Sequence, residues 1–165
     1  MMHILLKNKN TLFFNDFEFK CCVGMNGLTK NKIEGDKKTP VGIYSLGNLF
    51  YRKDRVGIIN TKLKKKIISK SMGWCDDIKS PKYNKLIKIS KKKIKHEKMY
   101  RNDKKYNLLV PIKYNMDKPI KNKGSAIFIH LTENYKPTVG CIALKKNDFL
   151  ILLKLINKKT KIKII

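Results

Sequence analysis

Alternation of apolar and polar positions predicts that the chain begins with strands. Two short apolar-rich runs, residues 11–14 and 17–20, flank Asn15 and Asp16, a pair of residues that favours a tight turn. This pattern predicts a β-hairpin whose second strand continues to Val23.

The next part of the chain alternates between loops and basic stretches. Residues 28–40 are expected to form a loop, and residues 41–46 a further strand. Residues 52–72 are basic and only loosely periodic. The lysine-rich run 90–98 is expected to be a solvated face or a loop.

Three apolar runs predict strands in the second half. Residues 106–114 contain Pro111, which cannot donate to a ladder, so this strand is expected at a sheet edge or at a bulge. Residues 125–131 are short and largely apolar, which favours a central, buried strand. Residues 161–164 alternate lysine with isoleucine and predict a closing strand.

Helical periodicity is convincing only after residue 146. Asn147 or Asp148 is suited to cap this helix, and Lys154 lies near its end, where cations favour the helix dipole. Its broad apolar face consists of Phe149, Leu150, Leu152, Leu153 and Ile156. We see no internal repeat and no interdomain linker, so residues 1–165 are expected to form one mainly β domain with a late α-helix.

Length and composition exclude several classes of protein. A hydrophobic fraction of 42% in 165 residues is too high for a disordered chain. No apolar run approaches the roughly 20 residues of a membrane-spanning helix. The four cysteines, Cys21, Cys22, Cys75 and Cys141, are too few and too irregularly spaced for a disulfide scaffold, and they form no C-x-x-C pair of a zinc ribbon.

The charge is strongly positive. Lysine and arginine number 39 against 12 acidic residues, a net charge of +27 that attracts nucleic acid, anionic lipid or acidic polymers. Only Arg52, Arg55 and Arg101 are arginines, the residue type that reads phosphates and base edges through bidentate contacts. We therefore expect a solvated lysine-rich surface, with a dedicated nucleic-acid surface as the alternative.

Candidate chemistry lies in the segment 138–144. Cys141 follows Gly140, and His130 stands eleven residues before the cysteine. A cysteine with a spatially adjacent histidine is the minimal constellation for thiol acyl transfer, because the imidazole can take the thiol proton. The amides of Gly140 and Cys141 are candidate oxyanion donors, worth roughly 3 kcal/mol each. The alternative is that a buried histidine and a buried cysteine serve only packing.

A second motif is the T-P-x-G-x-aromatic run from Thr39 to Tyr44, which leads into a predicted strand. Pro40 fixes one turn torsion, and Gly42 permits a torsion that other residues resist. Taken alone, this run indicates only a rigid turn.

Together these segments resemble the L,D-transpeptidase catalytic domain family, also called YkuD-like. That family carries a T-P-x-G run before a strand, a strand that ends in histidine, and a [ST]-x-G-C-[IV] segment. The matching segments here are Thr39–Tyr44, Ile127–His130 and Thr138–Ile142. A subgroup has further runs that match Gly73–Asp77, Pro81–Asn84, Tyr114–Asn115 and Gly124–His130. The resemblance covers the chain from about residue 12 to its end.

The resemblance implies a β-sandwich fold and a role for each motif residue. Cys141 corresponds to the acyl-accepting nucleophile, His130 to its general base, and Gly140 with Cys141 to the oxyanion amides. The family cleaves the bond before a terminal D-amino acid of a peptidoglycan stem and passes the stem, held as a thioester, to an amine of a neighbouring stem. With water as acceptor, the same site would act as an L,D-carboxypeptidase or amidase. No metal, cofactor or specific nucleic acid is implied, and the oligomeric state stays undefined.

The chain departs from the family pattern at three points. Val139 stands where many members have a second histidine, and Ala143 stands where many have arginine or asparagine. The interval from His130 to Cys141 is also shorter than in most members. These departures leave the acceptor and the type of cross-link open.

Six further residues are candidates for substrate contact: Trp74, Asp76, Asp77, Tyr114, Asn115 and Thr138. Trp74 can equally belong to the core or the cleft wall. The two aspartates can bind the free amine of a stem, or accept backbone amides within their loop. Tyr114 and Asn115 can close the cleft or simply end a strand.

Orientation of the catalytic imidazole and cellular location are the remaining questions. Because Leu131 follows His130, a backbone carbonyl is expected to orient the imidazole, with Asp76 or Asn134 as alternatives. The family acts in the cell envelope, yet the first residues lack the pattern of a signal peptide. The export route is therefore undefined, and a cytoplasmic location stays possible.

Overall fold

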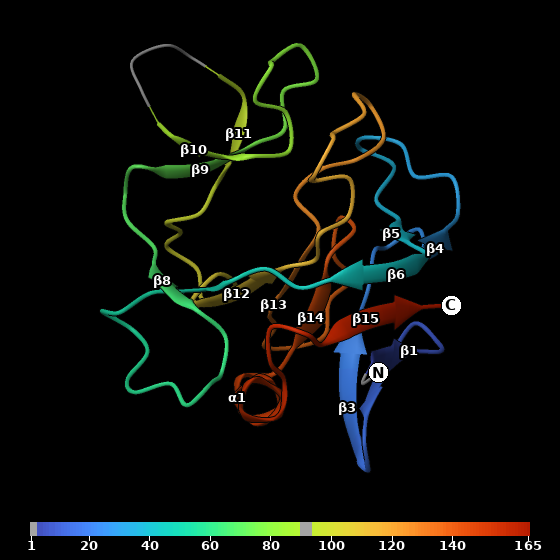
Figure 1. Ribbon diagram of the computed structural model, residues 1–165, viewed down its shortest axis with the longest axis vertical. Coiled ribbons are helices and arrows are strands. Elements are labelled where there is room, and N and C mark those ends of the chain that lie inside the picture. The colour runs from blue at the N-terminus through green and yellow to red at the C-terminus, as the bar shows by residue number, and fades with distance from the viewer. Residues whose placement is uncertain (1–2, 90–93) are drawn as a thin grey trace.

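The structure is a computed structural model that describes residues 3–89 and 94–165, and it consists mainly of strands (Figure 1). The largest sheet contains, in spatial order, β6 (Gly42–Ser45), β15 (Lys161–Ile164), β1 (His3–Leu6), β2 (Thr11–Phe14), β3 (Phe17–Cys22), β14 (Ile142–Leu144), β13 (Phe128–Leu131), β12 (Leu108–Pro111), β7 (Leu49–Tyr51) and β8 (Lys65–Ile67). A three-stranded sheet contains β10 (Leu86–Lys88), β9 (Met72–Cys75) and β11 (His96–Lys98). A two-stranded sheet pairs β4 (Leu28–Thr29) with β5 (Thr39–Pro40), and helix α1 spans Lys146–Leu155.

The predicted hairpin and the predicted central strand both form. Strands β2 and β3 pair in antiparallel fashion and turn at Asn15, whose φ of 52° is tolerated by asparagine. Strand β13 lies between β14 and β12, and all four of its side chains are buried. Strand β15 closes the sheet between β1 and β6. The expectation of a mainly β fold with a late helix is confirmed.

Two predicted loops contain strands. The loop predicted over 28–40 includes β4 and β5, which pair in parallel. Residues 96–98 of the lysine-rich run form β11, whose backbone pairs with β9, whereas residues 90–93 lie outside the described residues. Strands β4 and β5 are only two residues long each, and the partner of β11 lies outside the lysine-rich run, so local composition carries no sign of either pairing.

Helix α1 begins two or three residues earlier than the predicted caps imply. Its N-cap is Lys145, which makes no side-chain capping bond, rather than Asn147 or Asp148. The start of the helix is set by packing, because it directly follows the buried strand β14 and brings Phe149 and Leu152 into the core.

Pro111 lies in a central strand and beside a bulge, not at an edge. Ile112 donates its N–H to Ile127 on the β13 side, so the N–H that Pro111 lacks would point toward β7. On that side Leu109 pairs with Phe50, and Ile112 pairs with Leu46. The two pairs are three residues apart on the strand of Pro111 but four residues apart on the strand of Phe50, so one extra residue forms a bulge. The missing donor therefore falls where the ladder is interrupted.

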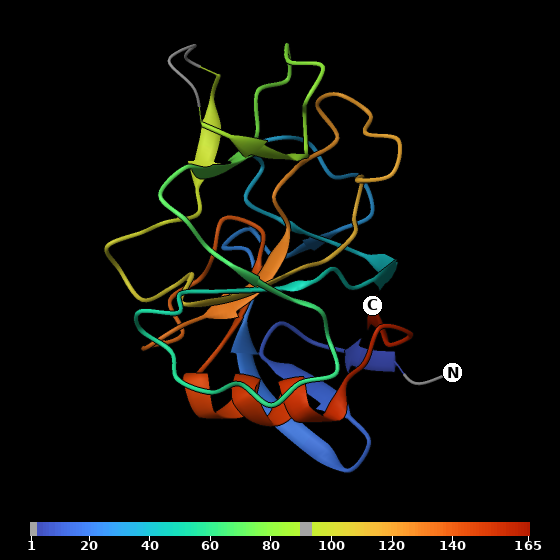
Figure 2. The same cartoon turned by 60° about the vertical axis from the view of Figure 1, so that its left-hand side comes forward.

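The central strands are covered on both faces. Helix α1 packs under one face through Phe149, Leu152 and Leu153, and the three-stranded sheet covers the other face through Trp74, which packs on Phe128 (Figures 1 and 2). Across the described ranges, no helix combines the length and apolar character needed to cross a membrane.

Candidate active site

Strand register brings Cys141 and His130 to the same face of the central sheet. Strands β13 and β14 run parallel, with Ile129 opposite Ile142 and His130 opposite Ala143. Both isoleucines face the core that contains α1. Because side chains alternate along a strand, His130 and Cys141 point to the opposite face, two positions apart on neighbouring strands.

The backbone before Cys141 requires glycine. Gly140 has a φ of 136°, and a Cβ atom built there would lie 3.0 Å from the carbonyl oxygen of Lys38. The buried hydroxyl of Thr39 donates to the Gly140 carbonyl oxygen at 2.8 Å and accepts the N–H of Gly24 at 2.9 Å. The T-P-x-G run thus holds the loop that presents the thiol.

Thr138 fastens the same turn from the other side. Its Oγ1 accepts the N–H of Gly140 at 3.1 Å and donates to the carbonyl oxygen of Cys141 at 2.6 Å. The Gly140 amide, predicted as an oxyanion donor, is therefore already bonded inside the protein. Thr138 is predicted as a substrate contact, but its hydroxyl forms hydrogen bonds within this turn.

The thiol of Cys141 is held between two backbone groups. Its Sγ accepts the N–H of Phe128 at 3.4 Å and donates to the carbonyl oxygen of Ala126 at 3.3 Å. The residue is only 4% exposed, and burial raises the pKa of the thiol to about 12. The resting group is thus a protonated thiol.

The imidazole of His130 is oriented by the backbone. Its Nδ1 lies 2.9 Å from the carbonyl oxygen of Leu131, as expected from the sequence. A carbonyl can only accept, so Nδ1 carries the hydrogen and Nε2 keeps a free lone pair. Burial lowers the pKa of His130 to about 4, and the charges of Lys105 and Arg101 act in the same direction. The imidazole is therefore neutral and able to accept a proton.

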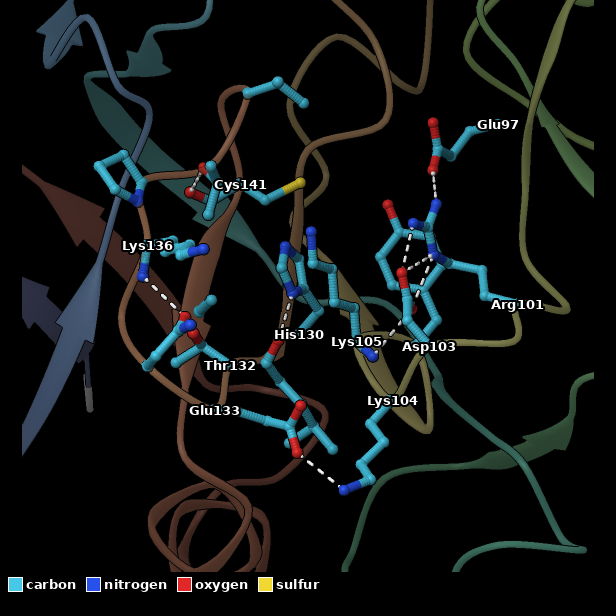
Figure 3. Close-up of a pocket in the computed structure, with 17 residues that line it drawn as sticks. Glu97, Arg101, Asp103, Lys104, Lys105, His130, Thr132, Glu133, Lys136 and Cys141 are labelled. Carbon is cyan, nitrogen blue, oxygen red and sulfur yellow. Dashed lines mark hydrogen bonds and ion pairs between the residues drawn. The ribbon is translucent and has the colours of Figure 1, made fainter.

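Both residues line one pocket of about 540 Å³ (Figure 3). Most charged groups in its wall are paired, Arg101 with Glu97 and Asp103, and Lys104 with Glu133. Lys105 forms no ion pair in the described part of the chain, and its side chain runs beside His130 in Figure 3. Within the described residues no hydrogen bond joins the thiol to the imidazole, so the thiol must turn away from Ala126 to reach the base.

Trp74 lies in the wall behind the thiol. Its ring packs edge to face on Phe128 and Phe50, and it is only 3% exposed. Its indole N–H donates to Oδ1 of Asn84 at 3.0 Å, and the same oxygen accepts the N–H of Ala126. The structure thus places Trp74 in the apolar cluster that also contains Cys141.

The two predicted aspartates lie outside the lining of the thiol pocket. Asp77 accepts the N–H of Lys79 at 2.9 Å, which is a local turn contact. Asp76 lies 3.9 Å from Lys95, and burial raises the pKa of Asp76. Neither carboxylate contacts His130, so the Leu131 carbonyl is the group that orients the imidazole.

Tyr114 and Asn115 close a surface loop instead of lining the thiol pocket. The Tyr114 hydroxyl donates to the carbonyl oxygen of Lys123 at 2.5 Å. The Asn115 side chain donates to the carbonyl oxygens of Ile120 and Gly124 and accepts the N–H of Ile120. Both residues therefore stabilise the loop that leads to the strand of His130.

Sequence reasoning missed three residues that build the site. Asn84 is buried and joins Trp74, Ala126 and the backbone of residues 114–115 through four hydrogen bonds. Tyr106 packs edge to face on His130 with ring centroids 5.4 Å apart, and Lys105 precedes it. Asn84 ends a motif run noted in the sequence, whereas Tyr106 carried no local signal. Among the described residues, no group of three or more His, Cys, Asp or Glu side chains is placed to hold a metal ion.

Comparison with known families agrees with this geometry. The YkuD family, described as the L,D-transpeptidase catalytic domain, matches residues 2–164. The chain belongs to this family. No curated protein matches the chain.

Two solved structures are similar to this YkuD chain, the first of them with a shared fold. A single-substitution mutant of the helical cell shape determining protein Pgp2 from Campylobacter jejuni has a TM-score of 0.52 and 23% identity, over 99% of this chain and 46% of that one. Unsubstituted Pgp2 gives a TM-score of 0.49 and 20% identity over the same shares. The chain therefore spans about half the length of the structures it matches.

Proposed function

We propose that the chain is a peptidoglycan L,D-transpeptidase in which Cys141 is the nucleophile and His130 the general base. In this proposal residues 1–165 act as one catalytic domain in the cell envelope, in a process related to cell shape, as the name of Pgp2 suggests for that protein. The observation that carries it is the shared pocket of a buried thiol and a neutral imidazole with a free Nε2, within a chain of the YkuD family.

Acylation begins with transfer of the thiol proton of Cys141 to Nε2 of His130. The thiolate then attacks the carbonyl carbon of the bond before the terminal D-amino acid, and a tetrahedral oxyanion forms. The imidazolium returns the proton to the leaving amine, the C–N bond breaks, and the stem stays on the sulfur as a thioester. In the second step His130 deprotonates an amine of a neighbouring stem, which attacks the thioester and releases the thiol.

Both pKa shifts oppose formation of the ion pair in the empty pocket. Burial raises the pKa of Cys141 and lowers that of His130, so the neutral pair dominates. The two charges stabilise each other once formed, and the substrate must bring the thiol from Ala126 to the base. We propose the Cys141 amide as the oxyanion donor, because the Gly140 amide donates to Thr138.

The test is mass spectrometry of purified muropeptides after incubation with the wild type and with Cys141→Ala. Cross-linked dimers formed by the wild type alone support transpeptidation. Cys22→Ser is the matched control, because Cys22 lies outside the thiol pocket and its sulfur donates to the carbonyl of Lys136, which serine can also do. Equal activity of Cys141→Ala would overturn the assignment.

The second candidate is an L,D-carboxypeptidase or amidase that uses the same thiol and base. The observation behind it is the shared pocket itself, because the same thiol and base would serve with water as the acceptor. Loss of one D-amino acid without dimers would identify it. Nucleic-acid binding by the basic surface is the distant alternative, and it would leave Thr39, Gly140 and the thiol pocket without a purpose.

A further inference from the structure

A second cavity, of about 750 Å³, lies outside the thiol pocket. Its walls come from β7, β8, β9 and β10 and from the end of β12, where the ten-stranded and three-stranded sheets meet. Neither Cys141 nor His130 lines it. The ring of Trp74 belongs to its wall and packs on Phe128, with centroids 5.1 Å apart. The cavity is thus separated from the thiol pocket by this aromatic pair.

All charged groups that line this cavity are lysines. They are Lys62, Lys64, Lys66, Lys85, Lys113 and Lys158. No aspartate or glutamate lines it, and none of the six lysines forms an ion pair in the described part of the chain. In the thiol pocket, by contrast, carboxylates neutralise Arg101 and Lys104. The thiol pocket thus mixes cations with carboxylates, whereas the lining of the second cavity contains six lysines and no carboxylate.

The interior of the cavity is apolar. Leu63, Phe50, Leu86 and Met116 contribute to it beside Trp74. The indole N–H of that tryptophan is already bonded to Asn84, so the ring offers mainly apolar surface. A volume of 300–1,000 Å³ with apolar walls and a few charged groups is typical of small-molecule sites.

We propose that this cavity binds an amphiphilic anion. Its carboxylate or phosphate head pairs with the lysines, and its apolar body lies on the apolar side chains that form the floor of the cavity. Lysine ammonium groups on flexible stems hold such heads as point charges without a fixed bidentate geometry. An apolar body removes the floor from water, which favours binding in proportion to the area buried. A hydrated linear polyanion would use the lysines but would gain nothing from that floor.

Trp74 is the sole tryptophan of the chain, so its fluorescence reports occupancy of the cavity directly. Dodecanoate and dodecyl phosphate, each below its critical micelle concentration, are titrated into the wild type and into Cys141→Ala. We expect a saturable change in emission with one ligand per chain, equal in both proteins. This equality separates the proposal from the transpeptidase function, because binding does not need the thiol. The tighter of the two ligands identifies the head group.

The charge contribution is tested with matched triple variants. Replacing Lys62, Lys66 and Lys113 by glutamine should weaken binding at least tenfold. Glutamine at three exposed lysines outside the cavity, at positions 30, 53 and 88, lowers the net charge equally and should change binding less than twofold. Equal weakening in both triples would overturn the proposal, since bulk charge alone would explain it.

The apolar contribution is tested with two more probes. Dodecanol, which lacks a charge, should bind at least tenfold more weakly than dodecyl phosphate. Hexaglutamate, which lacks an apolar body, should likewise fail to displace it at equal concentration. Displacement by hexaglutamate at equal concentration would overturn the proposal in favour of a polyanion surface. Absence of any saturable change at Trp74 would overturn it as well.

Discussion

The hydroxyl of Thr39 donates a 2.8 Å hydrogen bond to the carbonyl oxygen of Gly140, a residue 101 positions further along the chain. Oγ1 of Thr39 also accepts the N–H of Gly24, so one buried side chain joins three segments. Gly140 is the residue before the candidate nucleophile. The position of the thiol therefore depends on a threonine that lies far from it in sequence.

Replacing Thr39 by valine keeps the shape of the side chain and removes both hydrogen bonds. We expect a loss of roughly 1–3 kcal/mol in the free energy of unfolding, because a buried N–H and a buried carbonyl lose their partner. Denaturant titration measures this loss. Thr39→Ser keeps the hydroxyl and should retain more stability and more activity than Thr39→Val, and equal behaviour of the two variants would contradict the assigned role.

Substituting Gly140 by alanine should strain the loop directly. The φ of 136° is disfavoured for alanine, and the new Cβ would lie 3.0 Å from the backbone oxygen of Lys38. Strain of this kind costs of order 1–3 kcal/mol. Thermal or denaturant unfolding of Gly140→Ala gives the value. Gly57→Ala is the control, because no atom lies within 4 Å of its Cβ position and stability should change little.

Local pattern was enough for several strands and for part of the site. Alternation of apolar and polar residues identified β2, β3 and β15, and a short apolar run identified β13. The sequence around His130 was enough to predict that a backbone carbonyl orients its imidazole, because the carbonyl belongs to the next residue, Leu131. Contacts between adjacent residues depend little on the rest of the fold.

Contacts between distant segments could not be predicted in the same way. The thiol of Cys141 donates to Ala126, a residue with a φ of 53° that no local pattern indicates. Asn84 ends a motif run of the sequence, yet only the structure shows that it is buried and joins Trp74 to the backbone of Ala126. The Gly140 amide is predicted as an oxyanion donor, yet the hydroxyl of Thr138 accepts its hydrogen.

Titration of His130 should make stability depend on pH. Its pKa is about 4 in the folded protein against an ordinary 6.5, so the unfolded chain takes up the proton first. The stabilisation is complete above pH 6.5 and is lost as the pH falls toward 4, by about 3 kcal/mol in all. Urea unfolding of wild type and His130→Gln between pH 7 and pH 4 measures the difference. Parallel curves for the two proteins would contradict the burial of a neutral imidazole.

Lys105 is expected to attract the carboxylates of a stem peptide, because it lines the thiol pocket without an acidic partner among the described residues. Lys105→Gln should raise KM at least fivefold, since the attraction of an unpaired cation for the substrate is lost. Removing a charge that lowers the pKa of His130 should also shift the acidic limb of the kcat/KM profile to higher pH.

Lys104→Gln is the matched control in the same pocket, because the charge of Lys104 is already neutralised by Glu133 at 2.8 Å. Its KM should stay within twofold of the wild type, and its acidic limb should not move. Steady-state kinetics over pH 3.5 to 8 measures both, and equal changes in the two variants would show that only the overall charge of the pocket matters.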